Sequence, residues 1–433
     1  MMATTRMWDL PQELVEKIMT RVPITSLKAV RCTCKTWDAI TKNCVLSKAA
    51  ATPQQFLTMN AKVYSLRFQE DFVHVSVKQV DLLNNEWEVS KVYHCDGLVL
   101  LCVAKAKDKD DDPKQLVVWN PYLCQTRWIV PRENFSMKDR YAIGYDDSDS
   151  RNHKILRFLD YYTIGPERKH EVGYEIYEIR SNSWRVLEVV KNPEWSIDMN
   201  QRGVSVKGNT YFFARHYVKN HGGYGGCTEE IFLLCFDFTK ERFGPRLPLP
   251  FHDSFNGFNG DLVTLSSFLR GGDDDDEQLA VLFGGFESGF FEIWVTLTVD
   301  PNRASWCKFL RVEPGPFSSY GFKLYSSRSS GSFFVDEENK VAVLFELFEL
   351  DRTKTAHKAF VFGQDGSFKS SVNLGEALIL EHRSPFTNCL YKAARPPLVC
   401  SSSYRPSLVQ VNQPLVHQRK RMSRSAALLR DQV

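Results

Sequence analysis

The chain has 433 residues, of which 43% are hydrophobic and 25% charged, with a formal net charge of +3; this balance is typical of globular proteins and argues against disorder throughout. The longest unbroken apolar run, Leu98–Ala104, is too short to cross a bilayer, and the first residues lack the apolar region of a signal peptide. We therefore expect neither secretion nor a membrane span, and we interpret the 11 Cys as free thiols of a reducing compartment, the cytoplasm, the nucleus or both.

Residues 8 to 44 have the pattern of two helices. Pro11 and Glu13 suit a first helical turn, because proline there loses no hydrogen bond and a carboxylate favours the positive end of the helix dipole. Apolar residues then recur at helical spacing on two faces, with Leu14 and Ile18 on one and Val15, Met19 and Val22 on the other. Pro23 ends this helix, since it has no amide donor and clashes with the preceding turn.

The second helix is expected to begin after Thr25 and Ser26, which are suitable capping residues. Four apolar residues follow at spacings of three, four and three and share one stripe: Leu27, Val30, Cys34 and Trp37. A pair of helices this small cannot bury so many apolar residues by packing on itself, and each large aliphatic side chain left in water forgoes roughly 1.5–3 kcal/mol. The surplus predicts either docking on a partner protein or packing against a second domain of this chain, and spacing alone does not choose between them.

The segment from Trp8 to Ile40 resembles the F-box motif. The matching features are the Leu-Pro start, the Pro in the middle, the Ser-Leu opening of the second helix, and an Arg-x-x-x-Lys-x-Trp end at Arg31, Lys35 and Trp37. The resemblance implies that a Skp-type adaptor, which joins a cullin and a RING subunit, contacts six residues: Leu10, Pro11, Leu14, Ile18, Leu27 and Val30. It also implies a small helical core that contains Val22, Cys34 and Trp37.

From residue 56 to 390, short runs rich in Val, Ile, Leu, Phe and Tyr alternate with polar turns, which is typical of β-strands. Five times an apolar strand meets a polar turn that a bulky residue follows, and the turn centres lie 58 to 63 residues apart: Asn120, Ser181, Thr239, Asn302 and Gln364. A repeat of this length predicts the blades of a β-propeller, because a ring of sheets covers both faces of each sheet and shields its edges. A β-sandwich array that does not close into a ring is the alternative.

Seven stretches of this region, among them HCDGLVLLC (94–102), VVWNP (117–121) and LLCFDFTKERFGPRLPLPF (233–251), resemble the plant F-box-associated domain of the first type. The resemblance implies an α+β multidomain chain in which small N-terminal all-α F-box helices precede an all-β kelch-like propeller. The expected divisions are an F-box at 1–50, a linker with the first strands at 51–92, the propeller at 93–411 and a basic, disordered tail at 412–433.

Four further segments differ in composition from the strands around them. Two acidic insertions, Lys105–Lys114 and Gly271–Glu277, are interpreted as lengthened surface loops, and residues 401–410 are expected to add the strand that closes the ring. From Lys392 onward the chain carries +7, which leaves −4 for the rest. The run Arg419–Arg421 is a weak signal for nuclear import or nucleic-acid binding, so we interpret the tail as solvated.

No arrangement of side chains predicts catalysis, a metal site or a cofactor site. His94 and Cys95 are adjacent on an expected strand and therefore point to opposite sides, which prevents a thiol relay. Three other groups lack the spacing of a calcium loop, a phosphate loop or a zinc site, respectively: the acidic runs 146–149 and 273–276, the glycine-rich run 221–226, and Cys32, Cys34 and Cys44.

Together the two resemblances imply a substrate-recognition subunit of an SCF-type (Skp–cullin–F-box) ubiquitin ligase. The F-box would dock on the adaptor, the propeller would bind a target protein that the sequence does not identify, and the chain would supply no catalytic residue. The alternatives are an F-box protein with a scaffold role outside a ligase, a propeller that binds a glycan or a nucleic acid, and a propeller enzyme with an appended helical pair.

Overall fold

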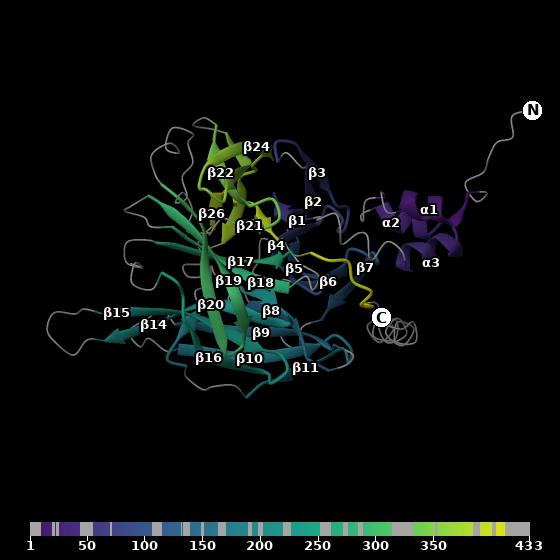
Figure 1. Ribbon diagram of the computed structural model, residues 1–433. Helices are drawn as coiled ribbons and strands as arrows, with labels where there is room; N and C mark the ends of the chain where they lie inside the picture. The colour runs from purple at the N-terminus through teal and green to yellow at the C-terminus, as the bar shows by residue number, and fades with distance from the viewer. Residues whose placement is uncertain are drawn as a thin grey trace, which may run out of the picture.

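The structure, a computed structural model, describes residues 10–19, 22, 26–43, 55–69, 72–105, 115–130, 132, 139–148, 151–162, 170–188, 193–197, 202–219, 227–251, 261–271, 276–284, 289–313, 332–350, 354–383, 390–400 and 404–411. It begins with three short helices, α1 (Gln12–Met19), α2 (Leu27–Arg31) and α3 (Lys35–Asn43), which lie to one side of a large β-domain (Figure 1). None of the helices in the described part of the chain is long and apolar enough to span a membrane.

The β-domain is a six-bladed propeller, which confirms the predicted fold class (Figure 1). Blade 1 contains β4 (Trp87–Cys95), β5 (Leu98–Lys105), β6 (Gln115–Asn120) and β7 (Gln125–Ile129), and blade 2 contains β8 (Arg140–Tyr145), β9 (His153–Tyr162), β10 (His170–Glu178) and β11 (Ser183–Val186). Blade 3 contains β12 (Ser196–Ile197), β13 (Val204–Val206), β14 (Asn209–Lys219), β15 (Cys227–Asp237) and β16 (Arg242–Leu247), and blade 4 contains β17 (Leu262–Arg270), β18 (Asp276–Gly284), β19 (Phe291–Asp300) and β20 (Arg303–Val312). Blade 5 contains β21 (Ser332–Asp336), β22 (Val341–Glu349), β23 (Thr355–Gly363) and β24 (Phe368–Glu376), and blade 6 contains β27 (Leu398–Val399), β1 (Gln55–Met59), β2 (Lys62–Phe68) and β3 (Val75–Gln79). A two-stranded ribbon pairs β25 (Leu380–Arg383) with β26 (Leu390–Ala393).

The ring closes through a strand from the C-terminal part of the chain. β27 pairs antiparallel with β1, so the sixth blade combines an early and a late segment of the sequence. The innermost strands contact one another in the order β4, β8, β13, β17, β21 and β27, and β27 contacts β4. This closed circuit excludes the open β-sandwich alternative.

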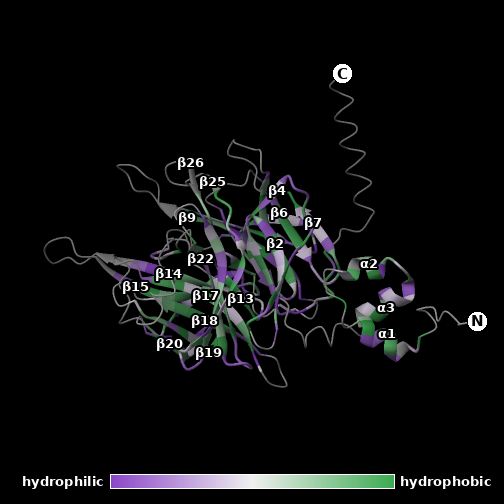
Figure 2. Ribbon diagram, turned by 90° about the horizontal axis from the view of Figure 1, so that it is seen from above, coloured by the Kyte–Doolittle hydropathy of each residue, from purple (hydrophilic) through white to green (hydrophobic). Residues whose placement is uncertain are grey.

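The strands are apolar because most of them are covered on both faces. In β5, Leu98, Leu100 and Cys102 pack toward blade 2, whereas the alternating residues Val99 and Leu101 pack toward blade 6. A strand buried on both sides needs a continuous apolar sequence rather than an alternating one. The outermost strand β24 alternates instead between half-buried and exposed residues. In Figure 2 the hydrophobic colour accordingly concentrates on the strands in the middle of the blades.

The five repeated turns all connect the third and fourth strands of a blade. They join β6 to β7, β10 to β11, β15 to β16, β19 to β20 and β23 to β24. In blades 2, 3 and 5 the bulky residue lies opposite an aromatic residue of the preceding strand: Tyr177 and Trp184, Phe236 and Phe243, and Phe362 and Phe368. The ring centroids in these pairs are 5.1, 5.1 and 5.9 Å apart, so the repeat marks a recurrent aromatic contact.

The helical region differs from the prediction in one respect. The expected second helix is broken at Cys32–Cys34 into α2 and α3. The hydroxyl of Thr33 donates to the Val30 carbonyl at 2.6 Å at the end of α2, and the Sγ atom of Cys34 accepts the amide of Trp37 at 3.4 Å at the start of α3. These bonds satisfy backbone groups that a helix end leaves without partners. The prediction that Leu27, Val30, Cys34 and Trp37 share one stripe of one helix is therefore wrong.

The closing strand also lies elsewhere than expected. It is β27, whereas residues 404–411 follow it without forming a strand. Residues 55–79, which we expected to contain a linker with the first strands, supply three strands of blade 6. The basic run 419–421 and most of the two acidic insertions lie outside the described residues.

Candidate protein-binding site

The first helix has two apolar faces that differ in exposure. The side chains of Val15 and Met19 point inward and are 5% and 1% exposed, whereas Leu14 and Ile18 are 45% and 39% exposed. Pro11, at the start of the helix, is exposed as well, and its carbonyl accepts the amides of Leu14 and Val15 at 2.9 and 3.2 Å. Three of the six residues that we expected on the adaptor-binding face, Pro11, Leu14 and Ile18, are therefore exposed to solvent.

The remaining expected residues are more deeply placed. Leu10 and Val30 are half-buried and pack against the inner cluster that contains Val15 and Met19. Leu27 is completely buried in that cluster. In this structure Leu27 packs inside the cluster and offers no surface to a partner, which corrects the expectation that it contacts the adaptor.

Two of the three residues expected in the helical core lie beside the inner cluster, and the third lies outside it. Val22 and Trp37 are partly buried and pack against the inner cluster, together with buried Ile40 of α3. Cys34 is exposed, because it caps α3 from outside the helix instead of continuing a stripe along it. Cys34 therefore does not belong to the core.

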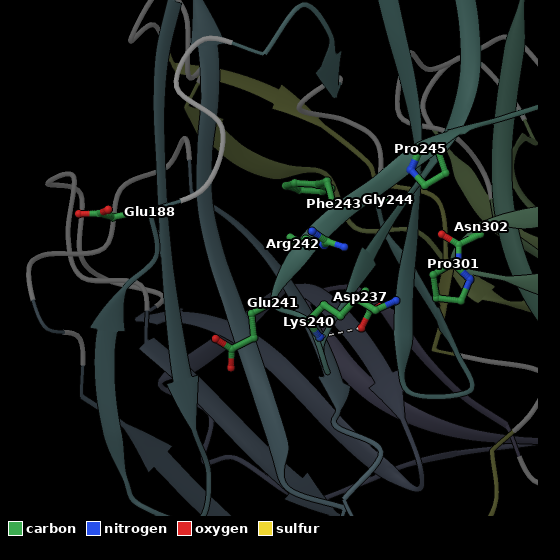
Figure 3. Close-up of a pocket in the computed structure, with 10 residues that line it drawn as sticks. All are labelled: Glu188, Asp237, Lys240, Glu241, Arg242, Phe243, Gly244, Pro245, Pro301 and Asn302. Carbon is green, nitrogen blue, oxygen red and sulfur yellow. Dashed lines mark hydrogen bonds and ion pairs between the residues drawn. The ribbon is translucent and has the colours of Figure 1, made fainter.

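A groove of about 670 Å³ lies at the edge of the propeller, between the turn that joins β15 to β16 and the turn that joins β19 to β20 (Figure 3). Its lining consists of five charged residues, two prolines, a phenylalanine, a glycine and an asparagine: Glu188, Asp237, Lys240, Glu241, Arg242, Phe243, Gly244, Pro245, Pro301 and Asn302. Gly244 allows the neighbouring turn to approach closely, since a Cβ atom there would lie 2.6 Å from the Pro301 carbonyl oxygen.

Most charges of the groove are paired with their neighbours. Lys240 lies 3.2 Å from Asp237, and Glu241 accepts hydrogen bonds from Lys154, at 2.9 Å, and from Arg185. Burial by itself raises the pKa of Glu241, but these two hydrogen bonds outweigh it and lower the pKa. The groove is thus a polar surface that suits contact with a protein segment better than it suits a buried small molecule.

A small cavity lies at the centre of the propeller, among residues of blades 1, 3 and 4 and the segment after β27. The cavity has a volume of about 10 Å³ and is lined by residues that include His94, Arg202, Ser267 and Cys400. Arg202 extends to the Val92 carbonyl oxygen of blade 1 at 3.3 Å. This cavity holds at most about one water molecule.

The residues that resembled a thiol relay are built into the core. The Cys95 side chain is buried, and burial raises the pKa of its thiol well above the ordinary value, which disfavours the thiolate that a nucleophile needs. Burial lowers the pKa of His94 to about 4, and its Nε2 atom accepts the Gly97 amide at 3.3 Å. Within the described ranges no group of three or more His, Cys, Asp or Glu is placed to hold a metal ion.

Two family models match the chain. The model of the F-box domain matches residues 7–48, and that of the F-box associated beta propeller domain matches residues 54–411. Three F-box/kelch-repeat proteins of Arabidopsis thaliana are each 50% identical over 429 residues, which cover 94% of this chain and 92% of theirs. Similarity to solved structures is low: the TM-score is 0.34 both for the tricorn protease (9% identity, 81% of this chain and 34% of that one) and for YjhT (10% identity, 70% and 92%).

Proposed function

Because this chain belongs to the family of F-box proteins that carry an F-box associated β-propeller domain, we propose that it is the substrate-recognition subunit of an SCF-type ubiquitin ligase. The F-box would bind a Skp-type adaptor and through it a cullin and a RING subunit, in the cytoplasm, the nucleus or both. The propeller would bind the protein that is to be ubiquitinated.

The observation that supports adaptor binding most directly is the open face of α1. Leu14 and Ile18 lie one helical turn apart, next to exposed Pro11, and neither the other helices nor the described part of the propeller covers them. Burying the exposed half of two such side chains in an interface contributes on the order of 1 kcal/mol each. The inner face is already occupied by the helical core, which leaves the outer face for a partner.

In this role the chain contributes position rather than chemistry. It would hold a target near the ubiquitin-charged enzyme and so raise the effective concentration of the target's lysine side chains. The groove between blades 3 and 4 is one candidate for contact with the target, because its exposed Arg242 and Glu188 can pair with charges on another protein.

The test is a pull-down of the purified full-length protein with a purified Skp-type adaptor. Leu14→Asp should abolish binding, because the interface would have to bury a charge without a partner. Leu350→Asp is the matched control, since Leu350 is a leucine that is 49% exposed and follows β22 of blade 5, outside the F-box helices. Equal binding by the two variants would contradict the assigned face, and adaptor binding without recovery of a cullin from cell extracts would favour the scaffold role.

A further inference from the structure

The turn between β6 and β7 connects three parts of the chain that are far apart in sequence. It spans residues 121–124, directly after Asn120 at the end of β6, and belongs to blade 1. Tyr122 of this turn contacts the F-box helices, and Asn120 contacts the segment that follows the closing strand. The equivalent turns of the other blades contact the blade that precedes them. In blade 2, for example, the Ile179 carbonyl accepts a hydrogen bond from Arg127 of blade 1.

Tyr122 is fully buried between the helices and the propeller. Its hydroxyl donates a hydrogen bond to the carbonyl of Thr41 in the last turn of α3. The last four carbonyl groups of a helix have no partner within the helix, so this bond satisfies a group that would otherwise need water. A residue of the propeller thereby completes the end of an F-box helix.

Arg31 joins the same turn to both of the last two helices. At the end of α2, its Nη1 atom donates to the Tyr122 carbonyl, and its guanidinium lies 4.5 Å from the centre of the Tyr122 ring. Its Nε atom donates to Thr41 Oγ1 at 3.0 Å. Charged hydrogen bonds and a cation over an aromatic face both restrict the orientation of their partners.

The turn itself is firmly held. Asn120 is fully buried, and its Oδ1 atom accepts the Leu123 amide at 2.9 Å. Its Nδ2 group donates to the carbonyls of Ser407 and Val409, each at 2.9 Å. A contact made to this turn is therefore a contact to the whole of blade 1 and to the C-terminal segment.

We propose that Arg31 and Tyr122 form a fixed joint that sets the orientation of the F-box helices relative to the propeller. The joint lies within this chain, so it does not depend on which adaptor or target protein binds. Its consequence for ubiquitin transfer rests on the proposed function: an adaptor bound to α1 would hold the propeller, and any target on it, at one angle. In that setting Arg31 and Tyr122 are positioning residues.

The experiment is small-angle X-ray scattering of the full-length protein, alone and with a Skp-type adaptor bound. Arg31→Ala and Tyr122→Ala should increase the radius of gyration and broaden the distance distribution, while near-UV circular dichroism shows that the propeller stays folded. Tyr122→Phe should give an intermediate result, since it keeps the ring beneath Arg31 but loses the bond to Thr41. Arg31→Lys should not restore the wild-type profile, because lysine cannot make the three contacts at once.

The matched control is Tyr177→Phe. Tyr177 is a buried tyrosine of blade 2 whose hydroxyl donates to Asn182 Oδ1 at 2.6 Å, next to the equivalent turn. The Tyr177→Phe variant should have a lower melting temperature and the same scattering profile as the wild type. If the Arg31→Ala variant folds and its scattering profile is unchanged, the proposed joint is wrong. This conclusion holds even if the Tyr122→Ala variant fails to fold. Scattering of the free protein tests the joint whether or not the adaptor binds, so failure of the proposed function is recognised separately.

Discussion

Ile18 and Met19 are neighbours in α1, yet the side chain of Ile18 is 39% exposed and that of Met19 is 1% exposed. The helix turns by about 100° between them, so one residue faces solvent and the other faces the core. Met19→Ala should destabilise the helical domain by about 2–5 kcal/mol because it leaves a cavity, whereas Ile18→Ala should change stability by less than about 1 kcal/mol. The stability of both variants is measured by urea unfolding that is monitored through amide hydrogen exchange in α1 to α3. Equal losses in the two variants would mean that the two faces are not distinct.

The second prediction concerns closure of the ring. Val399 of β27 lies opposite Leu57 of β1, and both are buried. Val399→Asp should cost more than about 4 kcal/mol, since it places a charge between apolar blades. Leu408→Asp is the control, because Leu408 follows in the same C-terminal segment but is 45% exposed. Thermal unfolding of both variants is the measurement, and a small shift for Val399→Asp would show that the ring tolerates an open blade 6.

The third prediction uses a buried carboxyl group. Glu346 of β22 is 5% exposed, and burial raises its pKa to about 8, an effect that a hydrogen bond from the Leu347 backbone only partly offsets. The folded state therefore binds a proton that the unfolded state releases above its own pKa of 4.5. Stability should fall as the pH rises from 4.5 to 8, by at most about 5 kcal/mol.

Replacing this carboxyl by an amide removes the titration. Glu346→Gln should unfold at higher urea concentration than the wild type at pH 8 and at nearly the same concentration at pH 4.5. The cation nearest to Glu346 in the register is Lys358, which lies directly opposite it. The ammonium group of Lys358, however, contacts the Phe348 ring, at 3.5 Å from its centre. An unchanged difference between wild type and variant across this pH range would show that Glu346 is ionised in the folded protein.

The fourth prediction concerns the thiols. Cys32, Cys34 and Cys307 are exposed, whereas Cys95, Cys102, Cys235 and Cys400 are buried. Burial raises the pKa of Cys400 to about 12, so its reactive thiolate is rare at neutral pH. A thiol reagent at pH 8 should modify the three exposed residues quickly and the four buried residues only on unfolding. Peptide mass spectrometry identifies the modified positions, and rapid labelling of Cys400 would place it outside the core.

The features that the sequence predicted are those that short segments specify. The five turns from Asn120 to Gln364 could be recognised because each turn and its flanking aromatic residues are contiguous in the chain. The sixth blade could not, since its innermost strand comes from residues 398–399 and its other strands from residues 55–79. Helical spacing placed Leu14 and Ile18 on one face, the F-box resemblance assigned that face to a partner, and the structure leaves it exposed.

The errors in the helical region have a local cause. The spacing of Leu27, Val30, Cys34 and Trp37 fits a continuous helix, but side-chain bonds from Thr33 and Cys34 stabilise a break instead. Hydrophobic periodicity does not register such competition between side chain and backbone. The contact of Arg31 with Tyr122 was also beyond prediction, because the two residues lie in different domains and each had a local explanation in its own motif.

The pairing of β1 with β27 also orders the events of synthesis. The F-box helices and five blades leave the ribosome before Leu398 does, and blade 6, the first to be started, is the last to be completed. A nascent or prematurely terminated chain therefore has its helices but no closed ring. In such a chain the edge of β1 that pairs with β27 has no partner strand, and exposed strand edges of this kind favour aggregation.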